Sequence, residues 1–136
     1  HSIQSILDGA RAALAAESDP AARLKALIRN HCGFFFRHPH NLTVLNRDMG
    51  ALTGAQREAI RTLEMEYLDL VRGVFRDGQK RGRLRKLDPT VAAFTLLGVL
   101  NSFDRWYDPA GPVAPNALVE HVETIFLDGV AEERRK

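Results

Sequence analysis

The sequence contains one cysteine, Cys32, and no long apolar segment. A single cysteine cannot form a disulfide within the chain, which fits a reducing compartment. The longest apolar run, at 91–100, is about half as long as a helix that crosses a bilayer. The N-terminus lacks the charged segment and the apolar core of a signal peptide. We therefore expect a soluble, cytoplasmic protein with no membrane partner.

The motifs of familiar enzyme classes are also missing. The sequence has no phosphate-binding glycine loop, no zinc-protease motif on a helix and no nucleophile elbow. The net charge of +2 is too small to indicate that this chain binds nucleic acid. We therefore predict that the chain is not an enzyme, has no catalytic residue and needs no cofactor.

Histidine and cysteine are concentrated between positions 31 and 40. On a helix, His31 and Cys32 point about 100° apart, so they cannot easily bind one ion together. His38 and His40 flank Pro39, which ends the helix. No second cluster completes a set of four zinc ligands. We therefore predict no metal site and interpret these histidines as partly buried residues of an amphipathic helix.

Apolar residues recur at spacings of three and four along the chain, and no segment alternates with a period of two. With 136 residues, 45% apolar and 26% charged, the composition is that of one soluble domain. Asp19-Pro20, Thr53 and Asp88-Pro89 are typical helix starts, and Gly82 is a typical helix stop. We predict an all-α domain with six helices, at 2–17, 20–38, 40–49, 54–81, 89–106 and 115–130.

The predicted helix at 89–106 is apolar on two sides, unlike a helix at the edge of a monomer, which has one apolar stripe. Spacings of three and four divide its side chains into two faces: Phe94, Leu97, Asn101 and Arg105 on one, and Leu96, Leu100, Phe103 and Tyr107 on the other. One face can serve the interior of this chain, and the other can pack against a second copy. We predict that this helix separates a ligand cavity from a dimer interface.

The run Phe34-Phe35-Phe36 covers most of the circumference of a helix, so at most two of the rings face one core. Ordinary core packing explains the run, and the wall of an apolar pocket is the alternative, since pockets are mostly apolar with a few polar groups. Asn101 and Arg105 would supply such groups. They either pair with protein partners, such as Glu64 or Glu66, or bind the polar end of a ligand. The predicted ligand-binding residues are His31, Phe35, Leu45, Met49, Leu68, Phe75, Phe94, Leu97, Asn101, Arg105 and Trp106.

The last predicted helix, at 115–130, carries a single apolar stripe. We place this stripe beside the second face of the helix at 89–106, in an interface between two copies of the chain. The predicted interface residues are Leu96, Leu100, Phe103, Tyr107, Leu118, Val122, Ile125 and Phe126.

A basic cluster lies at the end of the longest predicted helix and in the following turn: Arg76, Lys80, Arg81, Arg83, Arg85 and Lys86. Basic residues at the C-terminal end of a helix complement its dipole and are usually solvated. The cluster has no interleaved aromatic residues and no recognition-helix pattern. We therefore do not expect this chain to contact DNA directly.

A set of short motifs is spread over the chain in this order: Gly82-Arg83-Leu84-Arg85, Asp88-Pro89, Gly98-Val99-Leu100-Asn101, Arg105-Trp106-Tyr107, Gly111-Pro112 and Leu127-Asp128-Gly129. With the order of the helices, these motifs resemble the effector-binding and dimerising half of TetR-type transcriptional repressors. The chain looks most like members that govern fatty-acid, steroid or other acyl-CoA catabolism. The resemblance spans nearly the whole chain, and its most specific part runs from Gly98 to Gly111.

The resemblance implies a six-helix TetR-type C-terminal domain whose last two long helices form a four-helix interface in the dimer. The preceding helices would enclose an inducer, and Asn101, Arg105 and Trp106 would meet its polar or thioester-bearing part. Inducer binding would lower operator affinity by changing the spacing of two N-terminal helix-turn-helix domains. Those domains would precede Ser2 and are absent from this chain, so DNA is a partner only through them.

We therefore predict that residues 1–136 form a homodimeric sensor domain that binds a small apolar effector of fatty-acyl, steroid or acyl-CoA type. The alternative is a purely structural all-α dimerisation module whose interior is filled by side chains.

Overall fold

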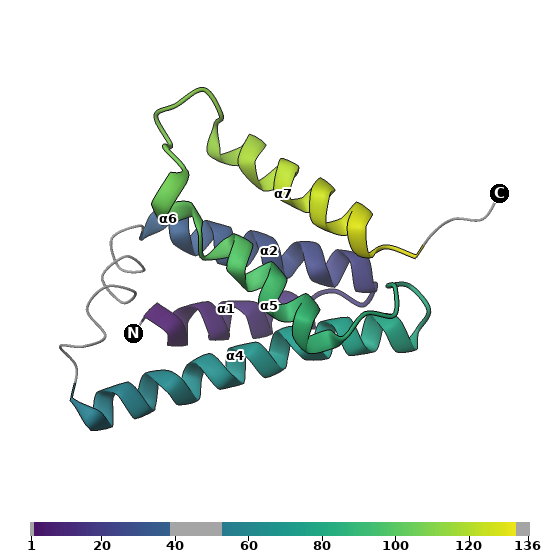
Figure 1. Ribbon diagram of the computed structural model, residues 1–136, viewed down its shortest axis with the longest axis horizontal. Coiled ribbons are helices and arrows are strands. Elements are labelled where there is room, and N and C mark those ends of the chain that lie inside the picture. The colour runs from purple at the N-terminus through teal and green to yellow at the C-terminus, as the bar shows by residue number, and fades with distance from the viewer. Residues whose placement is uncertain (1, 39–52, 133–136) are drawn as a thin grey trace.

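The computed structural model describes residues 2–38 and 53–132, and their regular structure is helical (Figure 1). The helices are α1 (Ser2–Ala15), α2 (Pro20–Arg37), α4 (Gly54–Lys80), α5 (Pro89–Leu100), α6 (Phe103–Trp106) and α7 (Pro115–Val130). One isolated antiparallel bridge joins Leu84 to Ala131. None of the helices in this part of the chain is long and apolar enough to span a membrane. The predicted all-α class is confirmed, and the helix predicted at 40–49 lies outside the described residues.

The predicted helix starts are confirmed where a polar side chain caps the backbone. Asp19 accepts a hydrogen bond from an N–H in the first turn of α2, at 3.1 Å. Thr53 and Gln56 form a reciprocal capping box at the start of α4. Asp88 accepts two N–H bonds in the first turn of α5, at 2.8 and 3.1 Å. These caps satisfy N–H groups that the first turn leaves unpaired, so they determine where the three helices begin.

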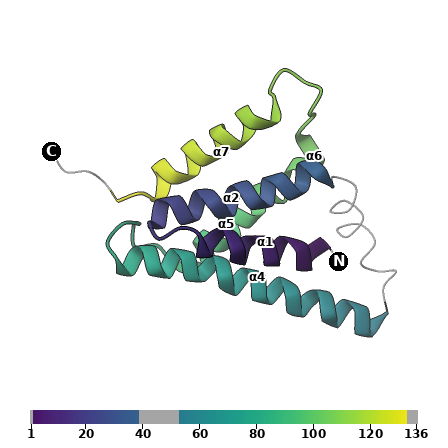
Figure 2. The same cartoon turned by 180° about the vertical axis from the view of Figure 1, so that it is seen from behind.

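Helix α2 lies in the middle of the molecule and contacts α1, α4, α5 and α7. Figure 1 shows α5 crossing in front of α1 and α2, and Figure 2 shows α1 and α2 in front of α5 from behind. Helix α7 packs on α2, on the side away from α4. The largest fully buried apolar side chains come from α1, α2, α4, α5, α6 and the turn after α4: Leu7, Leu24, Leu27, Ile28, Val71, Val74, Phe75, Leu84, Leu96, Leu100 and Phe103.

The predicted helix at 89–106 is interrupted. Helix α5 ends at Leu100, and α6 starts at Phe103 after Asn101 and Ser102. Asparagine and serine compete with the helical backbone through their side chains. Here the Ser102 hydroxyl donates to the carbonyl of Val99 at 2.7 Å. The prediction of a continuous helix is therefore wrong, and Asn101 is the C-cap of α5 rather than an interior residue.

The face of α5 that was predicted to meet a second copy packs inside this chain. Leu96, Leu100 and Phe103 are fully buried in the core of this chain, so their assignment to a dimer interface is wrong. Phe94, predicted to line a ligand cavity, is 58% exposed. Both faces are apolar, so the pattern does not show which one turns inward. The packing of α2 and α4 against α5 decides it.

The predicted interface stripe on α7 is divided between the core and the surface. Leu118 and Val122 are buried in the core of this chain, so their assignment to an interface is also wrong. Phe126 is half-buried, and the centre of its ring lies 6.0 Å from that of Phe75. Ile125 is 74% exposed and is accessible to a partner.

Candidate functional site

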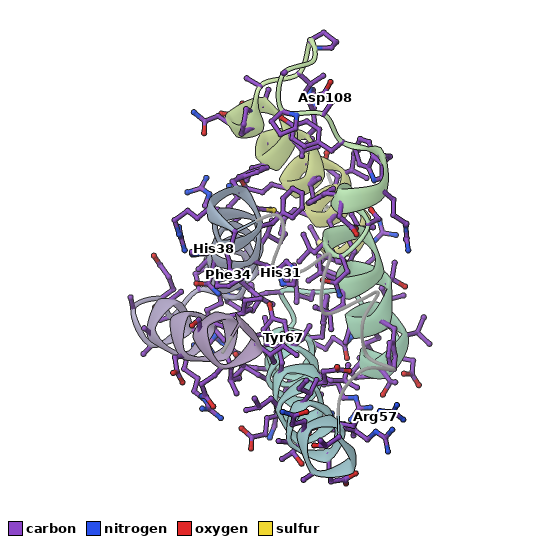
Figure 3. The ribbon with its side chains drawn as sticks, turned by 90° about the vertical axis from the view of Figure 1, so that its left-hand side faces the viewer. His31, Phe34, His38, Arg57, Tyr67 and Asp108 are labelled. Atoms are coloured by element: carbon purple, nitrogen blue, oxygen red, sulfur yellow. The ribbon has the colours of Figure 1, made fainter. Side chains whose placement is uncertain are left out.

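His31, on α2, is a polar side chain inside the core and is only 2% exposed. Its Nδ1 lies 2.9 Å from the hydroxyl oxygen of Tyr67 on α4, and its Nε2 lies 2.9 Å from Oδ1 of Asn101 at the end of α5. Figure 3 shows His31 and Tyr67 in the interior between their helices. We call His31, Tyr67 and Asn101 the His31 triad. Its two hydrogen bonds join three helices.

Burial keeps the His31 triad uncharged. Removal from water lowers the pKa of His31 from 6.5 to about 4, and the hydrogen bond with Asn101 opposes this only in part. Burial raises the pKa of Tyr67, and the nearby Cys32 raises it further, so the hydroxyl keeps its proton. A neutral imidazole has one donor and one acceptor, and it can therefore serve both neighbours at once.

Cys32 does not have the properties of a catalytic cysteine. Burial, and secondly the carboxylate of Glu123, raises the pKa of Cys32 to about 12. The thiol therefore stays protonated at neutral pH, whereas the thiolate is the nucleophile and the metal ligand. Within residues 2–38 and 53–132, no group of three His, Cys, Asp or Glu side chains is placed to hold a metal ion.

The three consecutive phenylalanines of α2 take different positions. Phe34 and Phe35 are buried, and the ring centre of Phe35 lies 5.9 Å from that of Phe103. Phe36 is half-buried, and its ring centre lies 6.1 Å from that of Tyr107. Core packing accounts for the first two rings, and the third meets the segment after α6. Tyr107 is itself half-buried in this chain.

The structure brings together some of the predicted ligand-binding residues and separates others. The buried ones are His31, Phe35, Leu68 and Phe75, and Leu97 is half-buried. The exposed ones are Phe94, Asn101, Arg105 and Trp106, while Leu45 and Met49 lie outside the described residues. Among the predicted residues, His31 and Asn101 are joined by a hydrogen bond. Phe94 is on the outer side of α5, where it is 58% exposed.

Asn101 connects the core to the surface. Its side-chain oxygen is bound to His31, while the residue as a whole is exposed. The protein partner of Asn101 is therefore a histidine and not one of the two suggested glutamates. Of these, Glu66 forms an ion pair with Arg11 at 3.2 Å, which joins α4 to α1. Nearby, the indole N–H of Trp106 donates to the Ser102 hydroxyl at 2.9 Å.

Two buried polar residues, Tyr67 and Glu123, carry no functional signal in the sequence. Tyr67 follows the three- and four-residue spacing of apolar residues along α4, and His31 follows the same spacing along α2. Because a buried hydroxyl and a buried imidazole each need a partner, pairing the two would have found this contact. Glu123 is buried on α7 and pairs with Arg29 of α2 at 3.2 Å. No local signal marks that glutamate as buried.

Three open hollows, of about 460, 350 and 320 Å³, lie beside Arg29 along α2. The first lies between α1 and α2, and the other two lie between α2 and α7. None of the three is lined by a predicted ligand-binding residue. The candidate site at the His31 triad is therefore separate from these surface grooves.

Part of the basic cluster at 76–86 holds the chain together. Arg81 pairs with Asp77 at 3.3 Å and donates to the carbonyl of Ser18 at 2.6 Å. Nε–H of Arg85 donates to the carbonyl of Ala131 at 3.1 Å. These contacts connect the turn after α4 to the segment after α1 and to the end of α7. Arg81 and Arg85 therefore make structural contacts, which the interpretation of this cluster as a solvated helix end does not include.

Solved structures of transcriptional regulators share this arrangement of helices. A TetR/AcrR-family regulator from Thermobifida fusca YX-ER1 matches with a TM-score of 0.78 and 32% identity, over 98% of this chain and 71% of that chain. The ketosteroid regulator KstR2 of Mycobacterium tuberculosis matches with a TM-score of 0.89 and 18% identity, over 97% and 68%. AibR, in complex with isovaleryl coenzyme A and operator DNA, matches with a TM-score of 0.80 and 22% identity, over 91% and 68%. The chain therefore shares its fold with about two thirds of each of these regulator chains.

A family model described as "Tetracyclin repressor-like, C-terminal domain" matches residues 17–130. The chain belongs to this family and is the C-terminal domain of a TetR-family transcriptional regulator, which confirms the resemblance found in its motifs. Regulators of this family act as dimers that bind DNA and ligands, and they are typically not enzymes. No curated protein sequence matches the chain.

Proposed function

We propose that this chain binds a small apolar effector, of fatty-acyl, steroid or acyl-CoA type, and that effector binding modulates DNA binding by helix-turn-helix domains outside this sequence. The observation that carries the proposal is the His31 triad, an uncharged polar group within an apolar and aromatic core, with Asn101 at the surface. Sites for apolar ligands combine such a lining with a few polar groups. The names of KstR2, a ketosteroid regulator, and of the AibR complex with isovaleryl coenzyme A support this effector class.

We place the homodimer interface on the outer faces of α5 and α7. Val91 and Phe94 on α5 are 63% and 58% exposed, and Ile125 on α7 is 74% exposed. Clusters of large exposed apolar side chains mark interaction sites, and a two-fold interface uses the same patch on both copies. Two helices from each copy would form the four-helix interface expected from the family resemblance. Its apolar contacts would come from the Phe94 side of α5.

The effector would act by shifting the population between two arrangements of the helices, to the extent of its differential affinity for them. Helix α1 is coupled to the helices of the triad by specific contacts. The side-chain amide of Asn30 on α2 donates to the carbonyl of Ile6 at 3.0 Å, and Arg11 pairs with Glu66 of α4. A change in the packing of α2 or α4 would therefore reach α1 and any domain attached before it.

Calorimetric titration of the purified protein with isovaleryl coenzyme A tests the proposed effector class. We expect saturable binding at one site per protomer. Mass spectrometry of solvent extracts tests for an effector that remains bound during purification. A protein with no heat of binding and no extracted molecule would favour the alternative function, a structural dimerisation module. We also propose a cytoplasmic location, which cell fractionation tests.

A further inference from the structure

We infer that His31 and Tyr67 are positioning residues that hold the Asn101 amide with its NH₂ group toward the surface, so that the effector must present a hydrogen-bond-accepting oxygen there. This inference rests on the proposed function, because it takes Asn101 as part of the effector site. It follows from counting the donors and acceptors of the His31 triad.

Two hydrogen-bonding patterns fit the positions of the triad atoms, because a neutral histidine carries its proton on either ring nitrogen. In the first pattern, the Tyr67 hydroxyl donates to Nδ1 of His31, and Nε2–H of His31 donates to Oδ1 of Asn101. Both donor–acceptor distances are 2.9 Å. Every buried donor of the triad then has an acceptor.

In the second pattern, the Asn101 amide is turned over and its NH₂ group donates to Nε2 of His31. Nδ1–H of His31 then donates to the Tyr67 oxygen, and the hydroxyl hydrogen of Tyr67 needs another acceptor. Among the described residues, the hydroxyl of Tyr67 has no hydrogen-bond partner besides His31. Tyr67 is buried, so this pattern leaves a buried donor unpaired. That penalty favours the first pattern.

The first pattern determines what Asn101 offers at the surface. Its oxygen is bound to His31 and the residue is exposed, so the NH₂ group is the part of the amide left to bind a ligand. These donors select a carbonyl oxygen, as in a thioester, or a carboxylate oxygen, and they disfavour an ammonium group. Rotation of the amide to suit a donor ligand would leave the Tyr67 hydroxyl unpaired. The buried part of the triad thereby sets the specificity of its exposed end.

The first experiment requires no effector. ¹⁵N NMR of histidine-labelled protein at neutral pH distinguishes the two tautomers, and His31→Gln assigns the His31 signals by their disappearance. We expect the Nε2–H tautomer in the wild-type protein and a weaker preference for it in Tyr67→Phe, which lacks the donor to Nδ1. The Nδ1–H tautomer in the wild-type protein would overturn the inference, whatever the binding results.

The second experiment changes only the outward group of the amide. Asn101→Asp keeps the side-chain shape and the oxygen that accepts from His31, but it replaces NH₂ with a carboxylate oxygen. Calorimetry with the acyl-CoA probe and with free isovalerate distinguishes a thioester carbonyl from a carboxylate as the acceptor. We expect about 10- to 100-fold weaker binding of whichever probe the wild-type protein binds.

Thr95→Val is the matched control, because it removes a hydroxyl from the same helix that is bonded to its own backbone. We expect it to bind the probe as the wild-type protein does, and circular dichroism and sedimentation check that each variant is a folded dimer. Wild-type affinity in Asn101→Asp would overturn the inference. If the wild-type protein binds neither probe and yields no extracted molecule, the proposed effector function is wrong, and the tautomer spectrum still decides the orientation of the amide.

Discussion

Acidification is expected to destabilise this protein through His31. The pKa of His31 is about 4 in the folded chain, against 6.5 for an unperturbed histidine. Between these two pH values the unfolded chain binds one proton more than the folded chain. The stability that the neutral imidazole contributes is therefore complete above pH 6.5 and is lost as the pH falls to about 4.

The size of this effect follows from the difference between the folded pKa of about 4 and the unfolded pKa of 6.5. Each pKa unit corresponds to about 1.4 kcal/mol, so the loss is on the order of 3 kcal/mol in the free energy of unfolding. Solvent screening does not reduce this figure appreciably, because His31 is buried. Small domains are stable by roughly 5–15 kcal/mol, so a loss of this size is a large share of the total.

Urea unfolding of the wild-type protein and of His31→Gln, between about pH 4 and pH 7, measures this contribution. Each series is run at one protomer concentration, because the stability of a dimer depends on concentration. The carboxylates are common to both proteins and cancel in the comparison. The wild-type slope should exceed that of the variant by about 1.4 kcal/mol per pH unit within the window. His38→Gln, at an exposed position, controls for the loss of a histidine, and parallel curves for wild type and His31→Gln would refute the reasoning.

The corrected faces of α5 and α7 predict different results for two charged substitutions. Ile125→Asp should give folded monomers by sedimentation, and an intact dimer would remove Ile125 from the interface. Phe103→Asp places a charge in the core and should cost several kcal/mol, so that a wild-type melting temperature would contradict its burial. Gly78→Ala should cost about 1–3 kcal/mol in urea unfolding, because the added methyl group overlaps the buried side chain of Leu84; unchanged stability would show that this contact relaxes. Arg105→Ala should weaken binding of the acyl-CoA probe and leave the dimer intact, and calorimetry showing unchanged affinity would exclude Arg105 from the site.

Local interactions explain why the helical class and most helix starts could be predicted. Asp19 and Asp88 cap N–H groups only two or three residues ahead, and each is followed by a proline that suits the first turn of a helix. Thr53 and Gln56 act over the same short distance. Such signals lie within one turn of the chain, and they can be recognised without knowing what packs nearby. The family could also be recognised, because its motifs are short and local.

The candidate site could be predicted only in part. His31 and Asn101 were both identifiable as polar residues on apolar faces, but they lie 70 positions apart, and nothing in either segment indicates the other. Tyr67 lies 36 positions from His31 and fits an ordinary apolar stripe. The end of α5 at Asn101 is hard to predict for a related reason, because the apolar spacing alone favours a helix that continues to Trp106.

The orientation of α5 shows most directly what packing adds to pattern. Spacing shows that Leu96 and Phe94 belong to two different apolar faces, because a hydrophobic pattern describes a helix about its own axis. Which face is buried depends on where α2 and α4 lie, and that direction is not a property of α5. The structure places Leu96 against these helices and leaves Phe94 exposed. A helix with a single apolar face would have made the same assignment predictable, whereas two similar faces leave it to the tertiary contacts.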